Sequence, residues 1–289
     1  MREIKARVNV PLAADVHFDY RLAVAAVENG ADKLRINPGN IGAKERVRIV
    51  ADCCRQHHVP IRVGVNAGSL EKNLKAEHKG DTVGAMVDSA LGHVRILENV
   101  GFDDIVISLK CSDVPTTVSA YRKIAEVTDY PLHVGITETG SGEDALIKSS
   151  VGIGTLLMEG IGDTVRVSLT DDPVREVEAA KRILFAAGLR KNGPEVISCP
   201  TCGRTRVDIG KIAAYVKEQL AGETGYIKVA VMGCAVNGPG EASDADIGIA
   251  FGQNNGVLFA KGNKIGSGPV NEITERLIDM AKELLKTGE

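Results

Sequence analysis

Short apolar runs alternate with amphipathic stretches through the first two-thirds of this chain, and that alternation most constrains its fold. Each run has the length of a strand, is rich in Val, Ile or Leu, and precedes a stretch with helical periodicity. Strands that alternate with helices in this way form parallel βαβ units. The runs are residues 8–14, 33–37, 61–66, 104–110, 131–137 and 164–169. The helical stretches are residues 20–30, 43–57, 83–100, 114–128, 142–159 and 173–188.

Polar residues gather where these runs end, and the carboxyl ends of parallel barrel strands all open on one face. The residues at these ends are Asp15, His17, Arg35, Asn37, Arg62, Asn66, Lys110, Glu138, Arg166 and Ser168. Four of them are Lys or Arg, which predicts an anionic ligand, most simply a phosphate or a diphosphate. For any single residue, the alternative is a charge that pairs inside the barrel and only holds structure.

The number of runs predicts an incomplete barrel followed by a second domain. A closed (β/α)8 barrel has eight strands and takes about 250 residues, whereas six runs are found in a chain of 289 residues. We therefore predict an α/β fold in which residues 1–190 form a TIM-type barrel that either has an unusual open form or lacks its first two β/α units. Residues 191–289 are predicted to form a smaller α+β domain. Its predicted elements are a helix at 209–220, strands at 227–232 and 246–251, an edge strand near 257–261, and a helix at 270–286.

Charge and hydropathy exclude some classes of function. The formal net charge of -3 provides no general basic field for nucleic acid. No apolar run approaches the roughly 18 residues of a membrane span, and the charged start of the chain lacks the apolar core of a secretory signal. We therefore expect a cytoplasmic protein. His57, His58, His78 and His93 are expected at the surface, and the charged run at residues 71–79 is expected to be a solvated segment.

Three cysteines of the second domain form the most specific local pattern. Cys199 and Cys202 flank a Pro-Thr turn, and Cys234 follows later. All six histidines precede this domain and it has no fourth cysteine, so a zinc site made of four cysteines, or of three cysteines and one histidine, is excluded within it. Three thiolates with an oxygen ligand or an open position favour a [4Fe–4S] cluster, and zinc stays the alternative. Glu241, in the glycine-rich loop after Cys234, is the candidate carboxylate for the fourth iron.

At this point the motifs resemble those of a known family, the GcpE/IspG family of 4-hydroxy-3-methylbut-2-enyl diphosphate synthases. The matching segments follow in order along the whole chain: ADVHF from residue 14, KLRINPGN from 33, RVGVNAGSL from 62, SLK from 108, GITE from 135, RVSLT from 166, CPTCGR from 199, GC from 233 and NGPGEA from 237. Family members carry roughly two more strand–helix units before the segment that matches Met1, so the chain is expected to lack them.

The resemblance implies an iron–sulfur oxidoreductase of the non-mevalonate isoprenoid pathway. It would open the ring of 2-C-methyl-D-erythritol 2,4-cyclodiphosphate and remove a hydroxyl, with electrons from a flavodoxin or a ferredoxin. Cys199, Cys202 and Cys234 would bind three irons of a [4Fe–4S] cluster and Glu241 the fourth. Glu138 would be the catalytic acid, and the other residues at the strand ends would bind the cyclic diphosphate. The family also implies a head-to-tail homodimer. A pterin-dependent type of barrel enzyme and a barrel bearing a zinc ribbon are the competing hypotheses.

Overall fold

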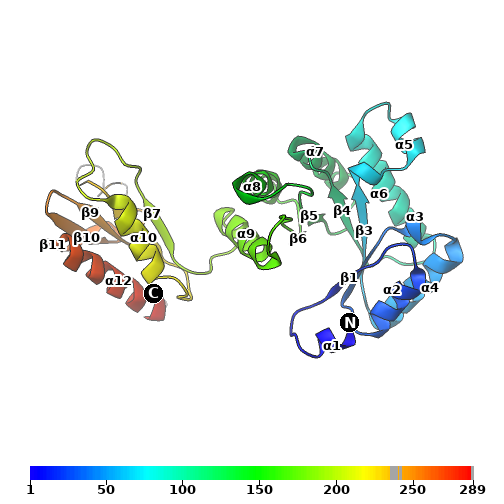
Figure 1. Ribbon diagram of the computed structural model, residues 1–289, viewed down its shortest axis with the longest axis horizontal. Helices are drawn as coiled ribbons and strands as arrows, with labels where there is room; N and C mark the ends of the chain where they lie inside the picture. Colours follow the sequence, from blue (N-terminus) through cyan, green and yellow to red (C-terminus); the bar gives the residue numbers. More distant parts are fainter. Residues whose placement is uncertain (235–239, 241–242, 288–289) are drawn as a thin grey trace. The chain divides into compact units, whose positions relative to one another are not determined.

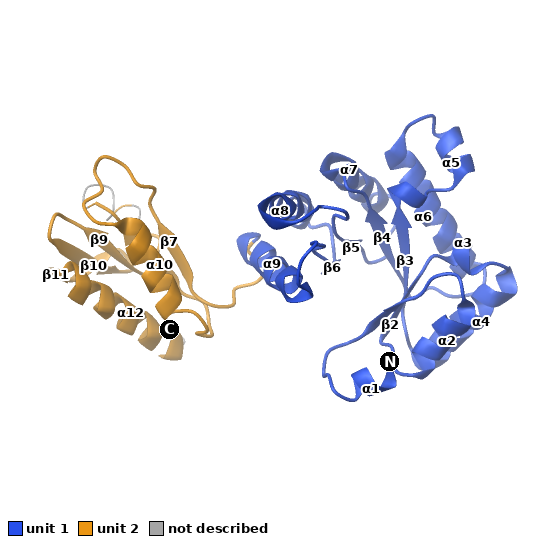
Figure 2. Ribbon diagram, in the orientation of Figure 1, with its two compact units in different colours: residues 1–187 blue, residues 188–289 orange. Residues whose placement is uncertain are grey.

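The computed structural model describes residues 1–234, 240 and 243–287. They form two compact units, Met1–Ala187 and Gly188–Glu289 (Figure 2). Each unit has its own hydrophobic core and is described separately below. In the described part of the chain, no helix is both long enough and apolar enough to cross a membrane.

The first unit is an arc of parallel strands that follow one another in chain order (Figure 1). Its four-stranded sheet holds β1 (Ala13–Asp15), β2 (Lys33–Ile36), β3 (Ile61–Asn66) and β4 (Ile105–Lys110). A parallel pair, β5 (His133–Val134) and β6 (Thr164–Val165), continues the arc through a single bridge between Ile107 and Leu132. The predicted strand–helix alternation is confirmed, although the last two strands are much shorter than their apolar runs.

One long helix follows each strand and packs apolar side chains against the sheet. These helices are α2 (Tyr20–Glu28), α4 (Lys44–His57), α6 (Thr82–Glu98), α7 (Val114–Ala125), α8 (Gly142–Met158) and α9 (Pro173–Ala186). Aspartates at four of their N-termini accept hydrogen bonds from backbone N–H groups, which explains where these helices begin: Asp19, Asp81, Asp113 and Asp172. Prolines in the first turns of α7 and α9 reinforce these starts, because no intrahelical N–H bond is needed there: Pro115 and Pro173.

The first unit also contains short elements that the sequence did not predict. They are α1 (Arg2–Lys5), α3 (Pro38–Ile41), the 3-10 turn η1 (Ala67–Ser69) and α5 (Lys72–Glu77). Residues 8–12, predicted as the start of the first strand, lie outside it. The charged run at 71–79 is largely exposed, as expected, and α5 occupies most of it and packs against α6.

Tyr121 of α7 connects β4 to the start of β5, where the two parts of the sheet pair through one bridge. Its side chain is fully buried, and its hydroxyl accepts a hydrogen bond from Leu109 N at 3.0 Å and donates one to His133 O at 2.5 Å. The hydroxyl therefore satisfies two backbone groups at a place where the sheet itself has only one bridge.

The second unit is a mixed sheet covered by two helices on one face. The strand order is β11 (Asn263–Pro269), β10 (Asn255–Ala260), β9 (Ile247–Phe251), β8 (Lys228–Met232) and β7 (Glu195–Ser198). β7, β8 and β9 are parallel, and the other two pairings are antiparallel. Helices α10 (Ile209–Gln219) and α12 (Val270–Thr287) pack their apolar side chains on the sheet. Two predictions were incomplete: β7 was missed, and β10 is interior because the glycine-rich β11 forms the edge.

Candidate functional site

Strand register brings the first predicted site residues together. Asp15 pairs with Arg35, and Arg35 pairs with Arg62, so the three residues form a row across β1, β2 and β3. Paired residues of neighbouring strands project from the same face of a sheet. Arg35 Nη1 donates to Asp15 Oδ1 at 2.8 Å and lies 3.0 Å from His17 Nε2. The prediction that these groups share one site is therefore consistent with the backbone pairing.

Gly64 of β3 leaves room for the Arg35 guanidinium. A Cβ added at position 64 would lie 2.5 Å from Arg35 Nε and 2.8 Å from Nη2, closer than any side chain allows. Arg35 is only 6% exposed. The absence of a side chain at this position of β3 therefore leaves the space that the Arg35 guanidinium occupies.

A second row lies at the carboxyl ends of the next strands. Asn66 pairs in register with Lys110 where β3 and β4 end. Asn66 Oδ1 is buried and makes no hydrogen bond. This row lies four residues beyond Arg62 along β3, on the same side of the sheet, because side chains alternate with a period of two.

We call the carboxyl ends of the strands in the first unit its mouth. The cations there lie near enough to one another to lower the pKa of Lys110 and of Arg62. Burial is the main cause that lowers the pKa of Lys110 to about 8, and Arg166, Arg62 and Arg35 lower it further. Burial and then Arg35 also lower the pKa of Arg62. Arg62 is 8% exposed, and its buried Nη1 atom has no hydrogen-bond partner. A buried guanidinium among like charges is costly on its own, so this arrangement is suited to an anionic ligand.

Glu138 lies in a strained turn beyond β5. Its φ of 54° is in the left-handed region, where residues other than glycine are uncommon. The adjacent Thr139 hydroxyl donates to Ser168 O, and Thr170 N donates to Gly140 O at 3.0 Å. These bonds tie the turn to the segment after β6, and Glu138 itself is exposed. An over-determined, strained backbone that presents an exposed carboxyl is typical of a functional position.

Arg166 and Ser168 follow β6 without belonging to it, since regular pairing ends at Val165. Arg166 N donates to Val134 O at 2.9 Å, so the segment still runs beside β5. Gly135 allows this approach, because a Cβ there would lie 2.5 Å from Arg166 O.

Asn37 begins the turn after β2, and its side chain has a structural task. Asn37 Oδ1 accepts a hydrogen bond from Gly39 N at 3.1 Å, and Asn37 is the N-cap of α3. Its amide nitrogen is not used by this cap.

Two buried histidines, His93 and His133, were not predicted as site residues from the sequence. His93 was expected at the surface, which is wrong: it is 5% exposed, on the face of α6 that packs against α3 and α5. His133 lies on β5, where Nδ1 is 2.8 Å from Thr164 Oγ1 and Nε2 is buried without a partner. Burial first, and then the neighbouring cations, lower the pKa of His133 to about 3. No sequence pattern marks either residue, because both depend on tertiary neighbours.

In the second unit, the cysteines follow the carboxyl ends of two paired parallel strands. Cys199 comes directly after β7, and Cys234 comes two residues after β8. Gly233 N donates to Cys199 Sγ at 3.2 Å, and Arg206 N donates to Gly233 O at 3.1 Å. Topology and hydrogen bonds thus hold the Cys199 segment against the residue that precedes Cys234.

The donor chemistry of these segments fits an iron–sulfur cluster. Backbone and side-chain hydrogen bonds from Arg204 and Thr205 lower the pKa of Cys202, which favours the thiolate that metals bind. None of the six cysteines is in a disulfide. Among the residues described, no three His, Cys, Asp or Glu side chains converge closely enough for a single metal ion. A four-iron cluster has a ligand on each iron and so spreads its thiolates wider than one ion does. Glu241, the predicted fourth ligand, lies outside the described residues.

The two units also match known families in the same order. A family model described as the GcpE TIM-barrel domain matches residues 1–181, and one described as the GcpE protein C-terminal domain matches residues 195–283. The chain belongs to the GcpE family. The resemblance and the α/β fold inferred from the sequence motifs are thereby confirmed.

Relatives in the GcpE family are similar over nearly the whole chain. A relative from Caldanaerobacter subterraneus subsp. tengcongensis is 54% identical over 286 residues, which are 99% of this chain and 81% of the relative. One from Ruminiclostridium cellulolyticum is 55% identical over 282 residues, 98% of this chain and 80% of the relative. Both are named 4-hydroxy-3-methylbut-2-en-1-yl diphosphate synthase (flavodoxin).

Among solved structures, dihydropteroate synthase from Stenotrophomonas maltophilia is similar with a TM-score of 0.45 and 15% identity. The similarity covers 66% of this chain and 74% of that one. A likeness this low carries no argument about function, so it does not support the pterin-dependent hypothesis.

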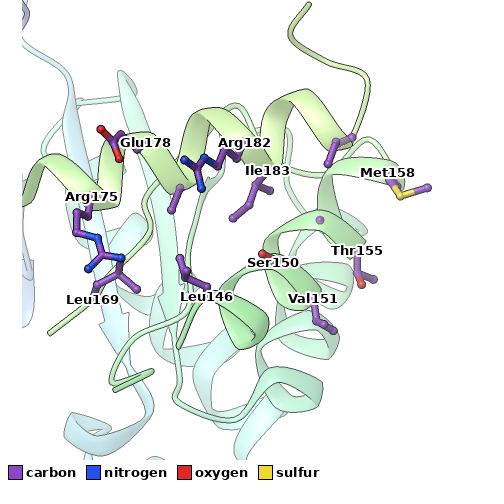
Figure 3. Close-up of a pocket in the computed structure, with 14 residues that line it drawn as sticks. Leu146, Ser150, Val151, Thr155, Met158, Leu169, Arg175, Glu178, Arg182 and Ile183 are labelled. Carbon is purple, nitrogen blue, oxygen red and sulfur yellow. The ribbon is translucent and has the colours of Figure 1, made fainter. Parts of the chain in front are cut away.

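An apolar cavity of about 660 Å³ lies between α8 and α9 (Figure 3). Leu146, Val151 and Ile183 are among its lining side chains, and Arg175, Glu178 and Arg182 lie along α9. None of the described site residues predicted from the GcpE-family motifs lines it. Its lining brings no acid, base or nucleophile into an arrangement that suits the chemistry of the family.

Proposed function

We propose that this chain is a 4-hydroxy-3-methylbut-2-en-1-yl diphosphate synthase that reduces 2-C-methyl-D-erythritol 2,4-cyclodiphosphate. The close GcpE-family relatives carry this activity in their names. The structural observation that carries the proposal is the buried Arg62. Its Nη1 has no hydrogen-bond partner, and three other cations lie near it. A cyclic diphosphate brings the negative charge and the acceptor oxygens that such a site lacks.

In this proposal the residues at the strand ends bind and orient the substrate. Arg35, Arg62, Lys110 and Arg166 neutralise the diphosphate. Asn37 and Asn66 supply amide groups at the ends of β2 and β3, and Ser168 supplies a hydroxyl. Asp15 and His17 hold the Arg35 guanidinium, for which Gly64 leaves room. Several fixed donors around one anion place its ring in a single orientation, which is a large part of catalysis.

Glu138 is the proton donor of the proposed reaction. Opening the ring and removing the hydroxyl consumes two electrons and protons and releases water. A hydroxyl leaves far more easily when a positioned acid protonates it. The exposed carboxyl of Glu138, on a turn that Ser168 holds, suits this role.

Cys199, Cys202 and Cys234, with Glu241, are the proposed ligands of a [4Fe–4S] cluster. When bound, the cluster would supply single electrons and a Lewis-acidic iron. The Gly233 N–H that donates to Cys199 Sγ would stabilise a thiolate there. Flavodoxin is the proposed electron donor, following the names of the relatives, with ferredoxin as the other candidate.

Two further parts of the proposal concern setting and assembly. Cysteines that bind a cluster must stay reduced, so we place the protein in the cytoplasm. The family resemblance also leads us to propose a homodimer.

Anaerobic purification followed by turnover tests the proposal. We expect about four irons and four sulfides per chain and conversion of the cyclodiphosphate when reduced flavodoxin is supplied. A chain that holds one zinc and no iron would contradict the cluster and favour the zinc-ribbon hypothesis. A chain loaded with cluster that does not convert the cyclodiphosphate would contradict the substrate.

A further inference from the structure

Two buried polar residues on α6, Ser89 and His93, contact the same carboxylate, that of Glu71, which lies outside α6. Ser89 and His93 are four residues apart, and so lie on the same face; they are 4% and 5% exposed. Ser89 Oγ donates to Glu71 Oε2 at 2.8 Å. His93 Nε2 lies 3.0 Å from Glu71 Oε1, in contact with the carboxylate although not aligned as a hydrogen bond. Glu71 ends the segment that leaves β3 through Asn66 and η1.

The other side of the same imidazole touches the turn after β2. A Cβ added at Gly39 would lie 2.6 Å from His93 Cε1 and 3.2 Å from Nδ1, so no side chain fits between the turn and the ring. Gly39 lies in α3, which begins at the Asn37 cap. α3 and α5 both pack against α6 (Figure 1). One ring therefore contacts the segments that follow two neighbouring strands.

We propose that His93 is a positioning residue that locks the turn at 37–41 to the segment at 66–71. In this way Asn37 and Asn66 reach the diphosphate in one fixed geometry. The inference rests on the proposed function, since it takes the mouth of the first unit as the site of the diphosphate. His93 touches neither the substrate nor the cluster in this account, and it acts through Gly39 and Glu71.

The chemistry of the contact favours positioning over simple filling of space. An aliphatic side chain would fill the volume, but it would leave the Glu71 carboxylate with Ser89 as its one buried partner. His93 Nδ1 is buried without a hydrogen bond, which costs stability. A polar group kept at such a cost is better explained by the arrangement it enforces than by the stability it adds.

The first test is His93→Leu in the cluster-loaded protein. We expect KM for the cyclodiphosphate to rise about tenfold, within the roughly 100-fold that misplaced positioning groups cost, while kcat stays within about twofold. The matched control is His78→Gln. His78 also bridges to α6, through Asp88 at 2.9 Å, but it packs against Gly84 and leaves Gly39 untouched. The control should keep both constants. An unchanged KM in His93→Leu, or an equal rise in the control, would overturn the inference.

A second test does not depend on how well His93→Leu folds. Gly39→Ala adds a methyl group where the ring lies, so KM should rise although His93 remains. His93→Ala opens that space. The double variant should therefore have a smaller KM increase than the product of the two single increases. Independent, multiplicative effects would show that the ring does not set the position of the turn.

Calorimetric binding of inorganic diphosphate separates this inference from the proposed function. A wild-type protein that binds diphosphate but converts no cyclodiphosphate would contradict the proposed function alone. Weaker diphosphate binding by His93→Leu would then still support positioning. A wild-type protein that neither binds diphosphate nor converts the cyclodiphosphate would overturn both, because the two turns would hold no anion.

Discussion

The mouth of the first unit and the cysteine segments of the second place their functional side chains by different means. At the mouth, residues on strands are aligned by backbone pairing, as Asp15, Arg35 and Arg62 are. In the second unit, Cys199 and Cys234 lie beyond the strands that precede them, and Cys202 lies on an exposed turn. The difference teaches that the charged side chains of the first unit are aligned by the fold itself, at the cost of crowded charge. In the proposed function, the cysteines of the second unit would be brought into their final arrangement by the cluster they bind.

The largest expected effect separates the two regions completely. Cys202→Ser should abolish turnover and iron binding, because serine does not replace a thiolate ligand of iron. Diphosphate binding at the mouth should change less than about twofold, since a substitution remote from a site usually leaves it unchanged. Iron analysis and calorimetry measure the two outcomes. Cys53→Ser, on α4, is the control and should keep both. Loss of diphosphate binding in Cys202→Ser would break the comparison.

The next effect lies within the mouth. Glu138→Gln should lower kcat by about 100-fold or more, the usual contribution of a positioned acid, while KM and iron content are retained. Glu143→Gln, at the exposed start of α8, should leave kcat unchanged. Loss of iron from Glu138→Gln would instead assign this carboxyl a structural role.

A smaller effect tests whether the buried cations at the mouth lower the stability of the fold. Arg62→Met removes a buried cation with an unsatisfied donor, so the free energy of unfolding should rise by about 1–3 kcal/mol. KM should rise at least about tenfold, which corresponds to roughly 1.4 kcal/mol of lost binding. Urea unfolding and steady-state kinetics measure the two. Arg55→Met removes an exposed arginine that bonds Val100 O and Gly101 O, and it should lower stability instead. A destabilised Arg62→Met would show that the crowded charges are already compensated.

The smallest expected effect concerns the protonation of Lys110. Burial and the neighbouring cations lower the pKa of Lys110 from 10.5 to about 8 in the folded protein. Between these values the unfolded chain binds more protons than the folded one, so this residue makes stability rise with pH across that window. Lys110→Met should lose the rise. Lys110 should also take up a fraction of a proton when diphosphate binds near pH 8, because a nearby anion favours the charged form of the lysine. Calorimetry in two buffers of different ionisation enthalpy measures the uptake, and its absence would contradict the assigned pKa.

Much of the first unit could be predicted from the sequence, because its information is local. Apolar runs of strand length with helical stretches between them define β3, β4 and the long helices closely. The residues that end the runs mark the mouth, since parallel strands must open on one face. β5 and β6 lie within predicted runs, but their short length could not be predicted, because it depends on how many hydrogen-bonded neighbours they have rather than on their own composition.

What the sequence could not predict depends on contacts between distant segments. His93 lies in a helical stretch where a histidine is ordinarily exposed, and only the packing of Gly39 and Glu71 makes it buried. β11, with its glycines and polar residues, lacks the composition of a strand and gains its place by pairing with β10. The three cysteines could be found by their pattern, whereas their spatial arrangement depends on the pairing of β7 with β8.

Gly64 has a consequence for any compound designed against this mouth. Every amino-acid replacement at that position adds a Cβ, and the Cβ would collide with the Arg35 guanidinium. In the proposed function Arg35 also binds the substrate. A replacement of Gly64 that displaced Arg35 from the acidic group of an inhibitor would therefore displace it from the substrate as well. Resistance through position 64 would carry its own penalty in fitness.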